Sequence, residues 1–566
     1  MRGWVWRRLL PLTGSILLLG VTMFTTTLGP AIIGRSEWAL PYDYWGTLLA
    51  ASRLAHFNLG GLYTQPTGLV SLPGAVVILL PVAGIINATG MSLAIPGPAN
   101  LHPAVWLLAG PYQVALSCVA LFAADALAER LGASWRRRAL LAAASTGALW
   151  NVTGRWGHPE DAVAVALLLY AILAMSRSRV PLAGWLAGAA VCVQPLVLLA
   201  LPVLVVVLPW RRMPWFLVRA ALPSAVLLAA AAVANWNTTF AAVTSQPDSL
   251  VINHPTVWTS LAPHMSGGNV AAGPARAATI VLACCCALAI RRHWRAAASP
   301  VAGDPITAAW SASSSGGPAV TWWPPELLAD VLWWAALALA LRSFFEPVMV
   351  AYYPWPVLAV ALIPTSVLSW RRLIAASVLA GGLTAAAQGT SHSVWVWWLP
   401  IIAGLIAQLT LARTRPRAVA PDLRLPPGTH PANALHSDLR DSSNGAWRTR
   451  PRPACSRSAP ARRAHPDPIP IYPTYTPESA AHQSPSHRAH TPPGMSGTDF
   501  QDHGPKSVCH HPLRPVIMVG GVAQPTPPER FRLYARKTHA WRRSQRTLLL
   551  ERGPGRRPCP NTHSGT

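Results

Sequence analysis

The chain has 566 residues, of which 52% are hydrophobic and 12% are charged, and its formal net charge is +26. Residues 1–411 are dominated by Ala, Leu, Val and Trp in apolar blocks, and about half of the Lys and Arg residues follow Leu411. A basic nucleic-acid-binding domain is therefore excluded, because the positive charge lies in short turns between apolar blocks and in a tail. The blocks predict an all-α polytopic membrane protein, since strand-length alternation is missing and a lipid-embedded backbone must otherwise be helical.

Residues 9–29 are the first apolar block long enough to cross a bilayer, and three arginines precede them. By the positive-inside rule these arginines stay in the cytoplasm, so Asp43 emerges on the far side. The block is longer than an ordinary signal core and ends in a poor cleavage site, so we expect an uncleaved anchor. An acid held at a membrane face among aromatic residues is costly to desolvate, which makes Asp43 a candidate functional group.

Two later blocks are interrupted by proline. Residues 69–86 contain two prolines and two glycines, which predicts a broken, interfacial or re-entrant element. Residues 182–208 have arginines at both ends and Gln194-Pro195 in the middle, which predicts a hairpin of two short helices. The long stretch 235–274 contains no Lys or Arg, as expected of an external loop. With the hairpin counted twice, about twelve crossings are expected, with both termini cytoplasmic: 9–29, 106–127, 140–152, 163–175, 182–208, 215–234, 276–290, 327–341, 348–368, 374–388 and 394–411.

The composition changes at about Ala412. Residues 412–566 are rich in Pro, Arg, His and Ser and poor in aliphatic residues, which predicts a disordered cytoplasmic tail without a catalytic role. Such a tail either touches anionic membrane lipids or is a non-functional extension. The eight cysteines lie in apolar blocks or are scattered through the tail, so neither disulfides nor a metal site is expected.

Polar residues gather in the predicted external segments. Carboxylates there can take a proton from a hydroxyl, arginine and protonated histidine can neutralise a phosphate, and aromatic rings can stack on sugars. The alternative is that 155–161 forms a solvated turn with acids favoured by a helix dipole, and that the aromatic residues form an interfacial belt. The candidates are Asp43, Arg155, His158, Glu160, Asp161, His254, Glu346 and Tyr352.

Four motifs follow one another along the chain. They are Asp43, Gly61-Leu62-Tyr63, the proline-broken block 69–86, and a glycine-containing block that ends at Gln194-Pro195. This order resembles the GT-C superfamily of membrane glycosyltransferases, and within it the family-87-like actinobacterial enzymes that use polyprenyl-phosphate sugars. The resemblance implies an extracytoplasmic active site with Asp43 as the catalytic base. A lysine of the family pattern is Gln194 here, so a positive charge is missing from that position.

The expected function is transfer of mannose or a pentose from a polyprenyl-phosphate donor to a lipid-linked or cell-wall glycan at the cell membrane. Arg155 and His158 are expected to stabilise the leaving phosphate, and the other candidates to bind donor or acceptor. No cofactor, metal or nucleic-acid partner is expected, and no glycine-rich phosphate loop is present for a sugar nucleotide. The alternatives are a transporter or lipid flippase, which the broken helices also suit, and a membrane scaffold that works through its tail.

Overall fold

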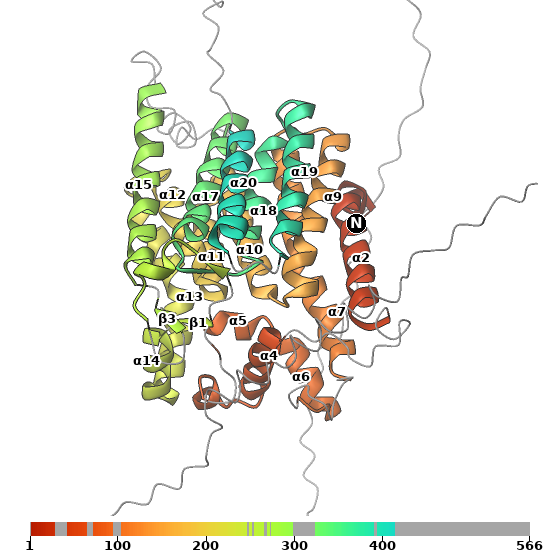
Figure 1. Ribbon diagram of the computed structural model, residues 1–566, viewed down its shortest axis with the longest axis vertical. Coiled ribbons are helices and arrows are strands. Elements are labelled where there is room, and N and C mark those ends of the chain that lie inside the picture. The colour runs from red at the N-terminus through yellow and green to blue at the C-terminus, as the bar shows by residue number, and fades with distance from the viewer. Residues whose placement is uncertain are drawn as a thin grey trace, which may run out of the picture. The chain divides into compact units, whose positions relative to one another are not determined.

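The computed structural model describes residues 2–28, 42–64, 69, 72–93, 104–245, 248–251, 254–264, 269–271, 273–297, 323–389 and 393–413 (Figure 1). The helices of this part are α1 (Arg2–Arg7), α2 (Leu9–Met23), η1 (Phe24–Leu28), α4 (Tyr42–Ala55), η2 (Leu59–Gly61), α5 (Pro73–Val77), α6 (Leu80–Thr89), α7 (Trp106–Ser117), α8 (Val119–Arg130), α9 (Trp135–Trp150), η3 (Asn151–Arg155), α10 (Pro159–Ser176), α11 (Val180–Val193), η4 (Pro195–Leu199), α12 (Leu201–Val206), α13 (Met213–Ala234), α14 (Trp236–Ser245), η5 (Thr259–Leu261), α15 (Gly273–Ala297), α17 (Pro325–Phe345), α18 (Trp355–Thr365), α19 (Trp370–Ala386), η6 (Val394–Trp398) and α20 (Leu399–Ala412). The short strands are β1 (Asp248–Val251), β2 (His254–Pro255), β3 (Asn269–Ala271) and β4 (Val348–Met349).

The chain is mainly helical, as predicted, and has the helices of a membrane protein. Within the described residues, six helical segments are long and apolar enough to cross a membrane: Leu9–Leu28, Trp106–Arg130, Pro159–Ser176, Met213–Ala234, Pro325–Phe345 and Val394–Ala412. Three shorter apolar helices, α6, α11 and α18, accompany them. Pro159–Ser176 is the most deeply enclosed of the six spans, and its helix α10 packs against α7, α8, α11 and α18.

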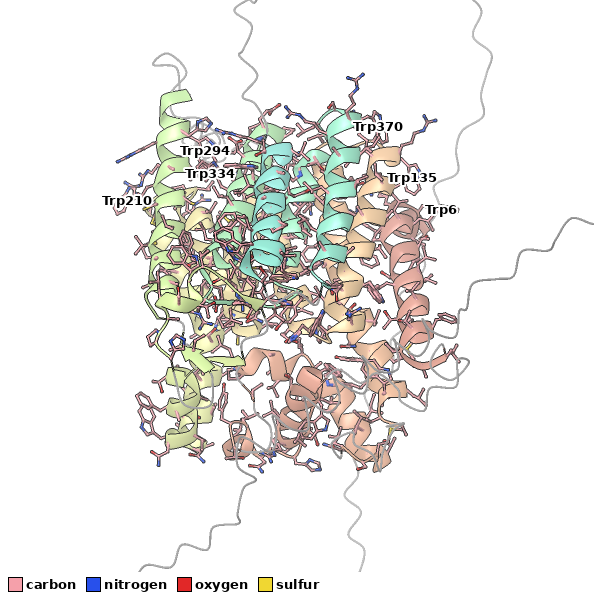
Figure 2. The ribbon with its side chains drawn as sticks, in the orientation of Figure 1. Trp6, Trp135, Trp210, Trp294, Trp334 and Trp370 are labelled. Atoms are coloured by element: carbon pink, nitrogen blue, oxygen red, sulfur yellow. The ribbon has the colours of Figure 1, made fainter. Side chains whose placement is uncertain are left out.

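The arginine-bearing helix ends lie together at one end of the bundle. Hydrogen bonds connect them: the Arg130 guanidinium donates to the Trp323 carbonyl (2.6 Å), and the Arg372 guanidinium donates to the Arg413 carbonyl (3.2 Å). The Trp323 N–H donates in turn to the Ser176 carbonyl at the end of α10 (3.0 Å). Six tryptophans also lie toward this end: Trp6, Trp135, Trp210, Trp294, Trp334 and Trp370 (Figure 2). Tryptophan and arginine together are typical of a membrane interface. We call this region the basic end.

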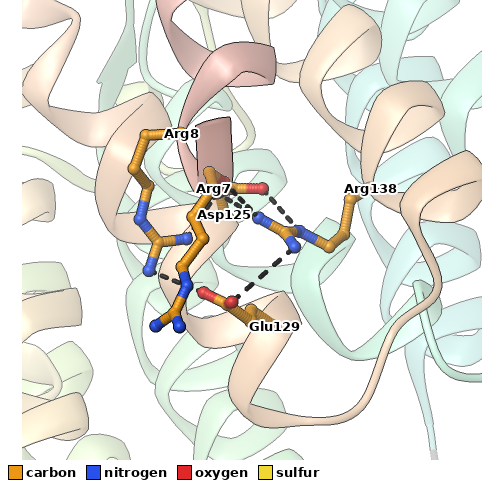
Figure 3. A network of polar contacts seen from close by, with 5 residues as sticks. All are labelled: Arg7, Arg8, Asp125, Glu129 and Arg138. Carbon is orange, nitrogen blue, oxygen red and sulfur yellow. Dashed lines mark hydrogen bonds and ion pairs between the residues drawn. The ribbon is translucent and has the colours of Figure 1, made fainter. Parts of the chain in front are cut away.

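A buried ion-pair network ties the first helix to the basic end (Figure 3). The Asp125 carboxylate, 3% exposed, pairs with Arg8 and Arg138, each at 2.6 Å. The Arg8 guanidinium also pairs with Glu129 (2.7 Å), and the Arg138 guanidinium donates to the Arg7 carbonyl (3.0 Å). Two arginines thus neutralise two acids while α2, α8 and α9 are held together.

The predicted hairpin at 182–208 corresponds to α11, η4 and α12. Gln194 is extended (φ −147°, ψ 114°) because the following Pro195 disfavours the helical conformation of the residue before it. Val180 and Arg211 line one cavity, so the start of α11 and the segment after α12 lie at the same end. Gly188 allows close packing of α11 on α13, since a Cβ there would lie 2.7 Å from the Ala220 carbonyl oxygen.

The block at 69–86, predicted to be a broken, interfacial or re-entrant element, is broken into two short helices, α5 and α6. Pro73 and Pro81 each lie in the first turn of one of these helices. A backbone N–H in the first turn has no partner within the helix, so a proline, which lacks this N–H, is tolerated there. Gly74 packs so closely against the Cys192 carbonyl that a side chain would not fit. The helix α4 contacts both α5 and α6, and α5 contacts α11. The proline-broken block therefore packs against the end of α11, next to the break at Gln194.

Two details differ from the sequence-based expectations. Four short strands make the all-α description incomplete: β1 pairs with β3, and β2 pairs with β4, both antiparallel. The predicted crossing 348–368 begins as strand β4 and a turn, and its helix starts only at Trp355, because Val348 and Met349 pair with β2 and Pro354 precedes the helix. The predicted tail lies outside the described residues apart from Ala412 and Arg413.

Candidate functional site

The first turn of α10 carries two buried acids at the end of the bundle opposite the basic end. Pro159 occupies the first helical position, and Glu160 and Asp161 follow in the first turn, where the helix dipole favours negative charge. Their exposed fractions are only 5% and 2%. The His158 ring bonds to Glu160 (Nδ1 to Oε1, 2.6 Å), and the Gln194 amide donates to Asp161 (Nε2 to Oδ1, 2.6 Å). Gln194 lies at the α11 break, so the broken helix supplies this contact.

Aromatic rings cover the histidine side of this pair of acids. The Tyr352 ring lies on the His158 ring with centroids 4.1 Å apart and an interplanar angle of 32°. The Trp156 ring is 6.1 Å from the Tyr352 ring, and Tyr353 meets Tyr352 edge-on at 5.3 Å. Both tyrosines lie in the turn between β4 and α18, whereas Trp156 and His158 lie between η3 and α10. Segments far apart in the sequence therefore form one aromatic wall.

Two arginines complete the site, and neither is among the residues predicted from the sequence. The Arg342 guanidinium lies 3.8 Å from the centroid of the Tyr353 ring, and its charge also attracts Asp161. Glu346, four residues further and 5% exposed, pairs with Arg276 (2.6 Å) and more loosely with Arg342 (3.9 Å). Arg342 directly follows the apolar block 327–341 and stands four residues, or about one helical turn, before Glu346. A charged residue in that position is a signal that could have identified it.

These residues form a connected set, which we call the acid–arginine cluster. Its members lie on α10, α15 and α17, at the ends of α10, α11 and α17, and in the turn before α18, and its three acids are buried. They are His158, Glu160, Asp161, Gln194, Arg276, Arg342, Glu346, Tyr352 and Tyr353. The cluster combines acceptors for hydroxyl groups, cations for a phosphate and flat apolar surfaces. That combination suits a polar, partly anionic ligand such as a phosphorylated sugar.

Tyr44 of α4 packs against α7, near the start of α10. The Tyr44 hydroxyl donates to the Ala109 carbonyl (3.3 Å), and its ring packs edge-on against Trp106 (6.2 Å). Burial raises the pKa of the Tyr44 hydroxyl above its ordinary value, and the Tyr112 and Glu160 charges add to that increase. Tyr44 therefore lies within electrostatic range of Glu160. Asp43 is the preceding residue of α4, but its side chain lies outside the described structure.

Arg155 and His254 are placed at the edge of this arrangement. Arg155 ends η3 with its side chain exposed, and among the described residues it forms no hydrogen bond or ion pair with the cluster. The His254 ring stacks on Trp397 with centroids 3.7 Å apart. Its strand β2 pairs with β4, and the nearby Thr256 hydroxyl donates to the Glu346 carbonyl (2.9 Å). The long loop thus packs over the end of α17 where Glu346 lies.

Of the predicted candidates, the structure brings together His158, Glu160, Asp161, Glu346 and Tyr352. Within the described part of the chain, no group of three or more His, Cys, Asp or Glu residues could hold a metal ion. Comparison with family models, curated proteins and solved structures finds no match to this chain. The chemistry of the cluster therefore carries the functional argument.

Proposed function

We propose that this protein is an integral-membrane glycosyltransferase of the GT-C kind with about twelve membrane-spanning helices. It transfers mannose or a pentose from a polyprenyl-phosphate donor to a lipid-linked or cell-wall glycan. The observation that carries the proposal is the acid–arginine cluster, in which buried Glu160 and Asp161 lie beside stacked aromatic rings and buried Glu346 pairs with two arginines. The order of motifs from Asp43 to Gln194-Pro195, which resembles this superfamily, supports the same assignment.

The orientation follows from the distribution of charge. The basic end carries the arginine clusters of the turns, and by the positive-inside rule it faces the cytoplasm together with both termini. The acid–arginine cluster lies at the other end of α10 and α17 and therefore faces the extracytoplasmic side. Asp43, His158, His254 and Glu346 share that side in this arrangement. Polyprenyl-phosphate sugars remain in the bilayer, so a site at this depth receives the donor laterally.

In the proposed reaction, the acceptor hydroxyl oxygen bonds to the anomeric carbon as the bond from that carbon to the phosphate oxygen breaks. Asp43 takes the hydroxyl proton, and the polyprenyl phosphate leaves with the bonding electrons. Arg276, whose side chain is 36% exposed, and Arg342 supply positive charge near the departing phosphate. Arg155 and His158 meet the donor at the edge of the cluster.

The remaining cluster residues hold the sugar. Glu160 and Asp161 accept hydrogen bonds from sugar hydroxyls, and Tyr352, stacked on His158, presents a flat face for the ring. His254 lies on the loop that packs over Glu346 and borders the acceptor path. The short helices α5 and α6 leave a broken element beside α11, and the polyprenyl chain lies along it. No soluble domain is required, because the donor is a membrane lipid.

The test is transfer from a panel of mannosyl, arabinosyl and glucosyl polyprenyl phosphates to a lipid acceptor by the purified full-length protein. Asp43→Asn keeps the size of the side chain but removes the basic oxygen, so transfer should fall at least about 100-fold. Asp248→Asn, in the long external loop, is the control and should retain wild-type transfer. Turnover that is undiminished in Asp43→Asn contradicts the assigned base, and absence of turnover with every donor contradicts the enzyme.

A transporter or lipid flippase is the second candidate, because one observation also suits it. The α11 break places Gln194 against buried Asp161, and broken helices with a polar contact at the break are typical of transporter sites. Reconstituted vesicles separate the two functions: the enzyme yields a new glycosidic product, whereas the transporter moves a labelled donor lipid between leaflets without product. Deletion of 420–566 tests the scaffold alternative, which requires loss of function with an intact membrane region.

A further inference from the structure

A second site lies at the basic end, away from the acid–arginine cluster. A cavity of about 390 Å³ opens between the start of α11 and the start of α13. Its lining residues are Val180, Pro181, Arg211, Arg212, Trp215 and Arg219. Half of these residues are arginines, and none of them is an acid. The size is within the range of cavities that hold a small ligand or a lipid headgroup.

The three arginines stand at two depths along α13. Arg211 and Arg212 precede the first turn and are exposed, whereas Arg219 lies about two turns inside the helix and is half-buried. The Arg219 guanidinium donates to the Trp215 carbonyl (3.1 Å) and lies 6.0 Å from the Trp215 ring. Close packing of Gly184 against the Arg219 Cβ fixes where this side chain leaves α13. Three arginine side chains therefore border the cavity, two at its mouth and one further in.

The wall that continues from the cavity is apolar and open. The helix α13 is the least buried of the six candidate membrane spans. Its outward residues Leu217, Val218, Leu222 and Val226 are each between 42% and 55% exposed. Trp210 and Trp215, which are 74% and 65% exposed, flank the mouth as interfacial tryptophans do. A ligand with a charged head and long apolar chains would contact both the arginines at the cavity and the apolar face of α13. A free anion would contact only the arginines.

We propose that this cavity binds the phosphate headgroup of an anionic glycerophospholipid, with its acyl chains along the exposed face of α13. Arginine forks bind phosphate oxygens in pairs, and basic pockets between membrane helices bind anionic headgroups. The site is separate from the proposed glycosyl transfer and does not depend on it. Its occupant is a lipid of the bilayer rather than the sugar donor.

The experiment is native mass spectrometry of the full-length protein in detergent with added dioleoylphosphatidylglycerol or dioleoylphosphatidylcholine. The wild type should retain the anionic lipid at least about 10-fold more tightly than the zwitterionic one, a difference of about 1.4 kcal/mol. The double variant R211Q/R212Q and the single variant R219Q should each lower affinity for phosphatidylglycerol about 10-fold. R219K, which keeps the charge but loses the fork, should fall between R219Q and the wild type.

The matched control is R291Q/R292Q, which removes an adjacent pair of exposed arginines from α15 at the same end. It should bind phosphatidylglycerol within about two-fold of the wild type. Equal losses in the control and in R211Q/R212Q indicate diffuse attraction and overturn the proposal. Unchanged binding in the cavity variants, equal retention of the two lipids, or displacement of the lipid by millimolar inorganic phosphate also overturns it.

Discussion

Two groups of buried charge lie at opposite ends of the same bundle, and they are built differently. At the basic end, Asp125 is held by two arginine guanidiniums at 2.6 Å, and each of its oxygens accepts a hydrogen bond. At the other end, Asp161 is equally buried, but its direct partner is the neutral Gln194 amide. Glu160 likewise bonds to a histidine ring rather than an arginine. Direct arginine pairing is absent from the two α10 acids in the described structure.

This difference separates a structural role from a functional one. A buried acid that is paired with two arginines has its charge offset within the fold, and removing it leaves uncompensated cations. An acid whose direct hydrogen-bond partner is an amide keeps more of its capacity to interact with a ligand. The ion pairs of Asp125 join α2 to α8 and α9. The contacts of Glu160 and Asp161 instead leave polar groups that can bind a ligand. Each arrangement can be tested by removing its central carboxylate.

The largest expected effect on stability is that of Asp125→Asn. The change leaves Arg8 and Arg138 near each other without their shared acid, so the free energy of unfolding should fall by about 3 kcal/mol. Thermal or denaturant unfolding in detergent micelles measures the loss. Glu129→Gln is the matched control: its side chain is 36% exposed, and its removal should cost no more than about 1 kcal/mol. Equal losses in the two variants contradict the structural role of Asp125.

The next effect concerns activity. Asp161→Asn preserves shape and an acceptor for the Gln194 amide, so the unfolding transition should move little. Transfer from the active donor should nevertheless fall about 100-fold, the usual effect of losing one electrostatic contact in a reaction centre. Initial rates per folded molecule, with unfolding measured in parallel, give both quantities. Glu326→Gln, an exposed first-turn acid of α17 at the basic end, is the control and should leave the rate unchanged. A loss of stability without a loss of transfer rate would show that Asp161 has a structural role, as Asp125 does, and would contradict the prediction.

Much of the helical framework could be predicted from the sequence because it depends on local composition. Apolar blocks, arginine clusters and prolines each act on their own segment, so the hairpin break at Gln194 and the short helices at Pro73 and Pro81 follow from a few neighbouring residues. The acids at the start of α10 were also visible, since a proline and two acids mark a helix start.

The contacts that assemble the acid–arginine cluster could not be predicted in the same way. Gln194 meets Asp161 across 33 positions, and Arg276 meets Glu346 across 70. Such pairs depend on how helices pack, and nothing in either segment specifies the partner. The pairing of β2 with β4 has the same origin, and it turned the first part of a predicted crossing into a strand. Arg342 directly follows the apolar block 327–341, and its partners Tyr353 and Glu346 are set by the turn after α17, so the sequence does not single it out.

The smallest effect, and the most specific, is expected at Gln194. Gln194→Leu removes the donor to Asp161, so kcat/KM should fall about 10-fold, the weight of one hydrogen bond to a charged acceptor. Gln194→Lys restores the residue type that the GT-C resemblance implies, and its ammonium group can donate to the same carboxylate, so kcat/KM should stay within about three-fold of the wild type. Steady-state kinetics with both variants measure the difference, and unfolding shows that each is folded. If both variants behave like the wild type, the 2.6 Å contact contributes only to packing, and the comparison between the two ends of the bundle loses its mechanistic meaning.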